Sequence, residues 1–205
     1  MIRLRLFLFL IFLFFSSLAI AGSHSINSNF EEEFEAAVVN IQEKKYLEAV
    51  KGFRALAKEG LPAAQFNLSL LNVSGLGTPK NFKEALYWSW YAHLNGHETA
   101  LDQVTQVYEF ITEDLRNDVA NQIIEELIEA ANSGDQMSAF KLGQTYTELL
   151  VTPDYQSAYV WLSIAQAYGL EEPSKLLKET AKQLTLEDIL VQQNEAADKF
   201  LKINP

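Results

Sequence analysis

The chain has 205 residues with a formal net charge of −11, and 48% of its residues are hydrophobic. That apolar content is too high for a disordered chain and sufficient for a folded core. Because the sequence has no cysteine, it excludes disulfide frameworks, thiolate metal sites and cysteine nucleophiles, and its acidic balance disfavours nucleic acid and anionic lipid as partners.

The first 21 residues have the order of a secretory signal peptide. Arg3 and Arg5 precede an apolar run over residues 6–15, and Ala19 and Ala21 supply the small side chains of a cleavage site. We expect cleavage after Ala21 and a periplasmic or secreted chain; an uncleaved N-terminal anchor is the alternative. Residues 22–29 are expected to be a disordered N-terminus, and residues 30–205 to form the folded part.

The folded part repeats itself. A shift of 74 residues places Phe66 on Phe140 and Pro79 on Pro153, and beyond that proline the shift becomes 73, which places Trp88 on Trp161. A half period of about 36 residues is also visible, since Gly60 recurs as Gly96. Periods of this size are typical of stacked helical hairpins.

The spacing of small and aromatic residues predicts ten helices in five antiparallel hairpins, hence an all-α solenoid. Ala85, Trp88 and Ala92 share one helical face, where small residues allow close packing and the aromatic ring fills the adjoining space. Glycines are expected to end helices at 60, 96, 134 and 169, and prolines to begin them at 62, 79, 153 and 173. The predicted helices span residues 29–43, 46–59, 62–74, 79–95, 97–111, 113–132, 135–150, 153–168, 172–183 and 185–202.

The spaced Ala, Leu, Gly and Trp residues of two segments resemble Sel-one-like repeats, a tetratricopeptide-like family. The matching stretches are 64–68, 75–77 and 82–88 in one unit, and 139–143 and 155–162 in the next. Residues 62–97 and 136–170 are the clear repeats, 98–133 a degenerate hairpin, and 172–202 the capping helices. Ser69 departs from the family's usual glycine, and residues 149–152 replace its Gly-x-Gly loop. The resemblance implies a right-handed superhelix that acts as an exported bacterial scaffold, and it implies no reaction.

Two short motifs could carry chemistry. Ser138 and Lys141 form the Ser-x-x-Lys pattern of penicillin-binding enzymes, but its partner motifs are absent from the sequence, so we expect Lys141 to lie on the solvated side of its helix. His93 and His97 have the i, i+4 spacing of a metal pair, but Gly96 is expected to end the helix between them. The sequence therefore predicts no catalytic residue, no metal site and no cofactor.

The acidic clusters are expected to be solvated helix starts and outer faces rather than acid–base pairs. They comprise Glu31, Glu32, Glu33 and Glu35, then Glu125, Glu126 and Glu129, then Glu171 and Glu172.

These observations favour a scaffold or adaptor that binds a protein or peptide partner in the cell envelope. By analogy with tetratricopeptide grooves, the first helix of each hairpin lines the binding wall. The candidate wall residues are Phe66, Leu70, Val73, Phe140, Gln144 and Thr147. The alternatives are a cell-wall-related hydrolase or penicillin-interacting enzyme, and a purely structural component of an envelope complex.

Trp90 has two interpretations. It lies off the face of Ala85, Trp88 and Ala92, and the second unit has only Ser163 in its place. Either the hairpin at 97–132 packs over the ring, or Trp90 is an anchor for the partner, because tryptophan is enriched at interface hot spots.

Overall fold

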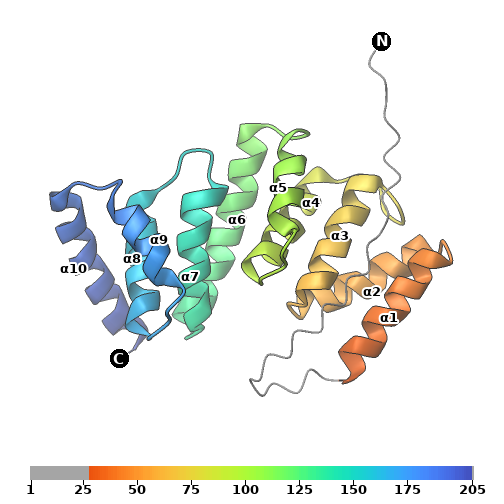
Figure 1. Cartoon of the computed structure of the whole chain (residues 1–205), viewed down its shortest axis with the longest axis horizontal. Helices are drawn as coiled ribbons and strands as arrows, with labels where there is room; N and C mark the ends of the chain where they lie inside the picture. Colours follow the sequence, from red (N-terminus) through yellow and green to blue (C-terminus); the bar gives the residue numbers. More distant parts are fainter. Residues whose placement is uncertain (1–27, 205) are drawn as a thin grey trace, which may run out of the picture.

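The computed structural model describes residues 28–204, and within this range the chain is helical with no strand (Figure 1). The predicted signal peptide and cleavage site lie outside the described residues. The elements are α1 (Ser28–Gln42), α2 (Tyr46–Lys58), α3 (Pro62–Ser74), α4 (Phe82–Leu94), α5 (Ala100–Tyr108), α6 (Glu113–Asn132), α7 (Gln136–Gln144), the π-helix η1 (Thr145–Leu149), α8 (Tyr155–Ala167), α9 (Pro173–Ala181) and α10 (Leu186–Ile203).

The helices form two layers that run from α1 at one end to α10 at the other (Figure 1). The first layer holds the odd-numbered helices and η1, and the second holds the even-numbered helices. Three predicted hairpins, α1/α2, α3/α4 and α7/α8, pack closely. In the other two, α5 packs mainly against α4 and α10 against α8, rather than against their chain neighbours α6 and α9. The predicted all-α solenoid is confirmed, but the two helices of each of these two hairpins pack mainly on other neighbours.

Four helices end at glycines, as predicted. Gly60, Gly96, Gly134 and Gly169 have φ between +84° and +96°, a left-handed conformation that costs other residues more than glycine. The chain therefore turns back at a regular interval, and each turn returns it to the opposite layer.

The prolines behave in two ways. Pro62 and Pro173 occupy the first turn of α3 and α9, as predicted. Pro79 and Pro153 do not begin helices, so that prediction is wrong for them. The helices after them start at Phe82 and Tyr155, because the side chains of Asn81 and Asp154 accept hydrogen bonds from backbone N–H groups and cap each helix.

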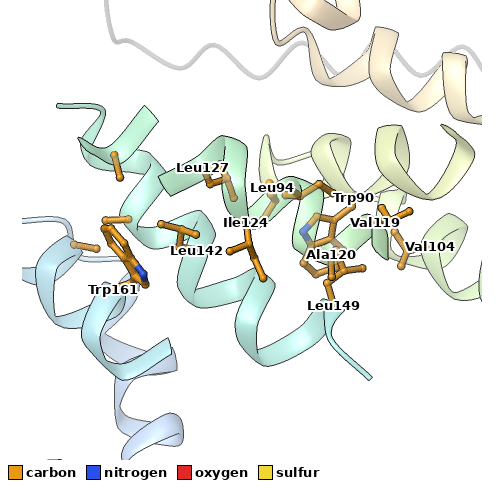
Figure 2. Close-up of a cluster of buried hydrophobic side chains, with 14 of the residues drawn as sticks. Trp90, Leu94, Val104, Val119, Ala120, Ile124, Leu127, Leu142, Leu149 and Trp161 are labelled. Atoms are coloured by element: carbon orange, nitrogen blue, oxygen red, sulfur yellow. The ribbon is translucent and has the colours of Figure 1, made fainter. Parts of the chain in front are cut away.

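Two hydrophobic clusters make up the core. The smaller joins α1, α2 and α3 to Trp88 of α4, and the larger runs from α4 to α10 and includes Trp90 and Trp161 (Figure 2). Trp88 and Trp161 occupy equivalent repeat positions, and both are buried. Their alanine neighbours are also buried, which lets the helices approach closely around each ring.

The start of α1 corrects one expectation. Ser28 and Asn29, placed by the sequence in a disordered N-terminus, belong to α1, and the Asn29 amide donates a hydrogen bond to Glu33 at 2.6 Å. The remainder of segment 22–29 lies outside the described residues. Within residues 28–204, no helix combines the length and the apolar character needed to cross a membrane.

Candidate functional site

The candidate wall residues all lie in the first layer. Phe66, Leu70 and Val73 belong to α3, and Phe140 and Gln144 to α7, while Thr147 belongs to η1. All six are partly exposed. We refer to the exposed and partly exposed side chains of α3, α5, α7 and η1 as the first-layer face.

Phe66 is covered on one side by a histidine. The rings of Phe66 and His97 stack with centroids 4.1 Å apart and an interplanar angle of 15°. The left-handed Gly96 ends α4 and lets the His97 amide bond to the Ala92 carbonyl, which turns the ring toward α3. Burial lowers the pKa of His97 below its usual value, because a charged imidazolium is poorly solvated there.

Three of the other wall residues also make contacts within the fold. Val73 and Phe140 pack partly against the larger core cluster. The Thr147 hydroxyl donates to the carbonyls of Gly143 and Gln144, at 2.9 and 3.1 Å. Leu101 of α5, which the sequence did not single out, lies between the two groups in chain order and is 44% exposed. The first layer therefore carries an exposed apolar side chain on α5 that sequence reasoning missed.

A chain of polar contacts joins α3 to α7 beneath this face. The Asn95 amide donates to the Gln65 side-chain oxygen at 2.9 Å, and the Lys141 ammonium donates to the Asn95 oxygen at 2.7 Å. Burial lowers the pKa of Lys141. The expectation that Lys141 lies on a solvated helix face is wrong, because its ammonium reaches across to the end of α4.

The Ser-x-x-Lys motif is not assembled as a nucleophile and base. The Ser138 hydroxyl donates to the Asp135 carboxylate at 2.5 Å, as part of the start of α7, whereas Lys141 binds Asn95. A nucleophile and its base need a direct hydrogen bond. Ser138 thus stabilises the start of α7, and Lys141 connects α7 to the end of α4.

The two histidines also have separate partners. His93 Nε2 lies 3.5 Å from a Glu148 carboxylate oxygen of η1, and His97 stacks on Phe66. Among residues 28–204, no group of three or more His, Cys, Asp or Glu side chains is placed to hold a metal ion.

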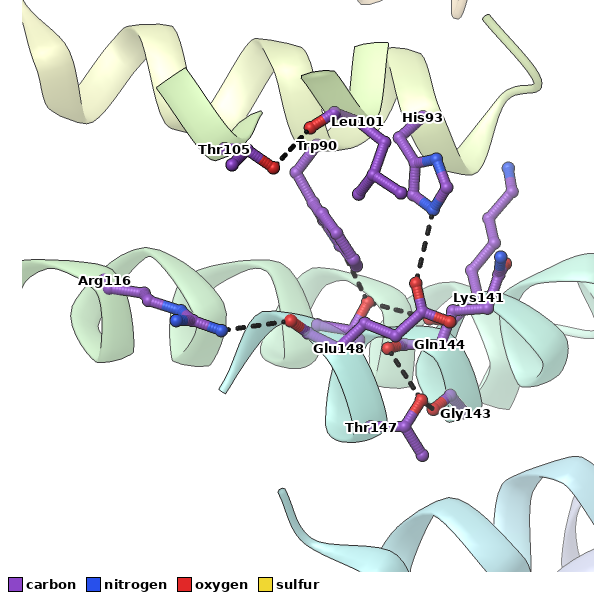
Figure 3. Close-up of polar contacts among 11 residues, drawn as sticks. Trp90, His93, Leu101, Thr105, Arg116, Lys141, Gly143, Gln144, Thr147 and Glu148 are labelled. Atoms are coloured by element: carbon purple, nitrogen blue, oxygen red, sulfur yellow. Dashed lines mark hydrogen bonds and ion pairs between the residues drawn. The ribbon is translucent and has the colours of Figure 1, made fainter. Parts of the chain in front are cut away.

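The segment η1 is the main departure from the predicted helix at 135–150. It continues α7 as a π-helix, which inserts extra backbone and turns the following side chains. The Arg116 guanidinium of α6 donates to the carbonyls of Glu148, Leu149 and Leu150, at 3.1, 2.7 and 3.1 Å. Figure 3 shows the contact with Glu148. The replaced loop at 149–152 was the one sequence signal of this irregular end.

The same segment buries Trp90. The ring is 0% exposed, lies among Val104, Ala120 and Leu149 (Figure 2), and its Nε1 donates to the Thr145 hydroxyl at 3.1 Å. The hypothesis that Trp90 anchors a partner is therefore wrong, because α5, α6 and η1 cover it. The alternative, that the following hairpin packs over it, is the one the structure bears out.

One of the acidic residues is not solvated as expected. Glu126 of α6 accepts hydrogen bonds from the hydroxyls of Tyr87 and Tyr91 of α4, both at 2.7 Å. Burial, and then this carboxylate, raise the pKa of both tyrosines. The cluster joins two second-layer helices, so its role is structural.

No protein-family model matches the chain, and no curated protein matches it. The chain is similar to the solved structure of a protective antigen of uropathogenic Escherichia coli that displays an SLR fold, with 20% identity and a TM-score of 0.39 over 85% of this chain. It spans 46% of that protein's length. It is also similar to a Sel1 repeat protein from Oxalobacter formigenes, with 21% identity and a TM-score of 0.39 over 84% of this chain and 74% of that one. Of these two solved structures, one displays an SLR fold and the other is a Sel1 repeat protein.

Proposed function

We propose that the chain is an exported scaffold that binds a protein or peptide along its first-layer face. The observation that carries the proposal is the exposed Leu101, which lies on the same layer as the partly exposed Phe66, Leu70 and Gln144. Apolar and aromatic side chains on rigid helices provide contact area at a low cost in conformational entropy. The hydrogen bonds among Gln65, Asn95 and Lys141 fix the positions of α3 and α7, the helices on which Phe66, Leu70 and Gln144 lie.

The export half of the proposal rests on the sequence. Residues 1–21 have the charged, apolar and small-residue order of a signal peptide, with Ala21 at the expected cleavage site. Removal of this segment takes away Arg3 and Arg5 and no acidic residue, so the exported chain is more acidic still. We place the partner in the cell envelope for this reason.

A pull-down from envelope extracts tests the binding proposal. We expect the chain to retain a partner in a fixed molar ratio, and the Leu101→Glu variant to lose it, because a carboxylate buried within an apolar contact is costly. Leu47→Glu is the matched control, since Leu47 of α2 is 55% exposed and lies outside the first-layer face. Equal retention by both variants would contradict the proposed site. Turnover of cell-wall fragments by the purified chain, without a bound protein, would instead favour a hydrolase.

A further inference from the structure

An apolar stripe runs along α10, the helix at one end of the row (Figure 1). Leu186, Leu190 and Leu201 are 74%, 54% and 66% exposed, and Ala197 is exposed between them. Steps of four, seven and four residues place these four side chains on one face of the helix. We call them the α10 stripe. The capping helix of a solenoid ordinarily has a polar outer face, so these leucines need another explanation.

The internal repeat shows how the equivalent positions are used on α6. Thr112 and Thr185 are equivalent positions, and each caps the start of its helix, α6 or α10. The α6 residues equivalent to Leu190 and Ala197 are Asn117 and Ile124. On α6, Ile124 is buried in the core and the Asn117 side-chain oxygen accepts a hydrogen bond from the Val151 amide, just after η1. Two of the four stripe positions, 190 and 197, thus correspond on α6 to residues that contact the rest of the chain, whereas no helix within residues 28–204 covers the stripe itself.

A groove beside the stripe is also left uncovered. It is lined by Ser163, Ile164 and Ala167 of α8 and by Gln193, Ala196, Ala197 and Phe200 of α10. Ser163 and Ala167 are the repeat equivalents of Trp90 and Leu94, whose large side chains fill the corresponding space in the first unit. The small side chains leave this space open for side chains from outside.

The charges of α10 favour pairing with a second copy of the same helix that runs antiparallel to it. Its first turn carries Glu187 and Asp188, and its last turn carries Lys202. A parallel copy would bring like charges together, whereas an antiparallel copy brings Lys202 toward Glu187 at both ends. Antiparallel pairing centred between Gln193 and Asn194 also sets Leu186 against Leu201 of the second copy, and Leu190 against the small Ala197.

We propose that the chain forms a two-fold symmetric dimer in which the α10 stripes of two copies pack antiparallel. Such an interface is isologous, so one contact covers both stripes and closes the assembly. It leaves the first-layer face of each copy available, and a bivalent scaffold results.

Cysteine cross-linking tests this geometry directly, because the sequence has no cysteine of its own. Asn194→Cys places one thiol beside the proposed axis, and Leu47→Cys places one on an exposed position of α2. Under mild oxidation of the full chain, we expect a disulfide-linked dimer from Asn194→Cys and not from Leu47→Cys. Equal cross-linking of both variants, or none from Asn194→Cys, would overturn the proposal.

The equilibrium mass of the chain gives a second test. Light scattering at micromolar concentration should find twice the chain mass, and Leu190→Glu should raise the dimer dissociation constant at least about thirtyfold, with little change from Leu47→Glu. Glu187→Lys should weaken the dimer, and adding Lys202→Glu should restore it. A monomer at all concentrations, or a double variant no better than Glu187→Lys, would contradict antiparallel self-pairing. Neither result depends on a partner bound at the first-layer face.

Discussion

The stack of His97 on Phe66 sets the character of the first-layer face at its α3 end. The ring centroids are 4.1 Å apart, and burial rather than a neighbouring charge is the main cause of the lowered pKa of His97. Glu98 acts in the opposite direction and does not compensate. A neutral, stacked imidazole adds no charge beside Phe66, which suits contact with an apolar side chain of a partner.

The titration of His97 tests this arrangement. With only three histidines in the chain, its NMR signal can be assigned from a His97→Gln variant. We expect a folded-state pKa below 6.5, so the unfolded state takes up the proton first and this group reduces folding stability as pH falls through that range. Phe66→Ala should raise the pKa toward 6.5, because it exposes the ring. A pKa that Phe66→Ala leaves unchanged would mean that the stack does not form in solution.

The sequence could predict those site residues whose positions follow from the spacing within one helix or from the repeat. The positions of Phe66 and Phe140 follow from helical spacing and the repeat alone, and they lie on the first layer as expected. The roles of Trp90 and Lys141 depend on contacts with residues 55 and 46 positions away, Thr145 and Asn95. Spacing within one helix carries no information about such contacts. For the same reason Leu101, in a hairpin without a clear repeat, was missed.

At the scale of elements, Arg116 compensates for the irregular end of η1. A π-helix leaves its last carbonyls without the usual helical partners, and the Arg116 guanidinium binds three of them in succession. Its planar group also lies 4.1 Å from the centre of the Tyr108 ring. One side chain of α6 thereby connects η1 to the end of α5.

Removal of this side chain should destabilise the fold measurably. We expect Arg116→Ala to lower the free energy of unfolding by about 2 kcal/mol, because partly buried carbonyls lose charged donors. Arg116→Lys should recover less than half of that, since an ammonium lacks the planar fork. The control is Arg54→Ala, which breaks a part-exposed ion pair with Glu84 and should cost about 0.2–1 kcal/mol. Equal losses in denaturant unfolding from Arg116→Ala and Arg54→Ala would contradict the role assigned to Arg116.

Helix existence was easier to predict than helix ends. All ten predicted helices are present, because most end at a glycine or begin near a proline or a capping residue. The starts of α4 and α8 were misplaced because Asn81 and Asp154 determine them, and not the prolines before them. The π-helix is accompanied by tertiary contacts of Arg116, Trp90 and His93, and the replaced loop at 149–152 was its one local signal.

At the scale of the whole molecule, the repeat determines the two layers, and the departures from it determine the surfaces. Between the two clear repeats, the short α5 packs on α4 and leaves Leu101 exposed. At the end of the row, α10 carries leucines on a face that no other helix of residues 28–204 covers. The first surface is the proposed partner site, and the second is the proposed contact between copies.

The proposed function requires that a protein partner binds the first-layer face in the cell. Its most direct test is site-specific photo-cross-linking in cells that express the full chain, with the photoreactive residue at Gln144 or, as control, at Leu47 of α2. Gln144 lies on α7 within that face, and Leu47 lies outside it. The account predicts a discrete protein adduct from position 144 that is absent from position 47. The same adducts at both positions, or none at 144, would contradict it.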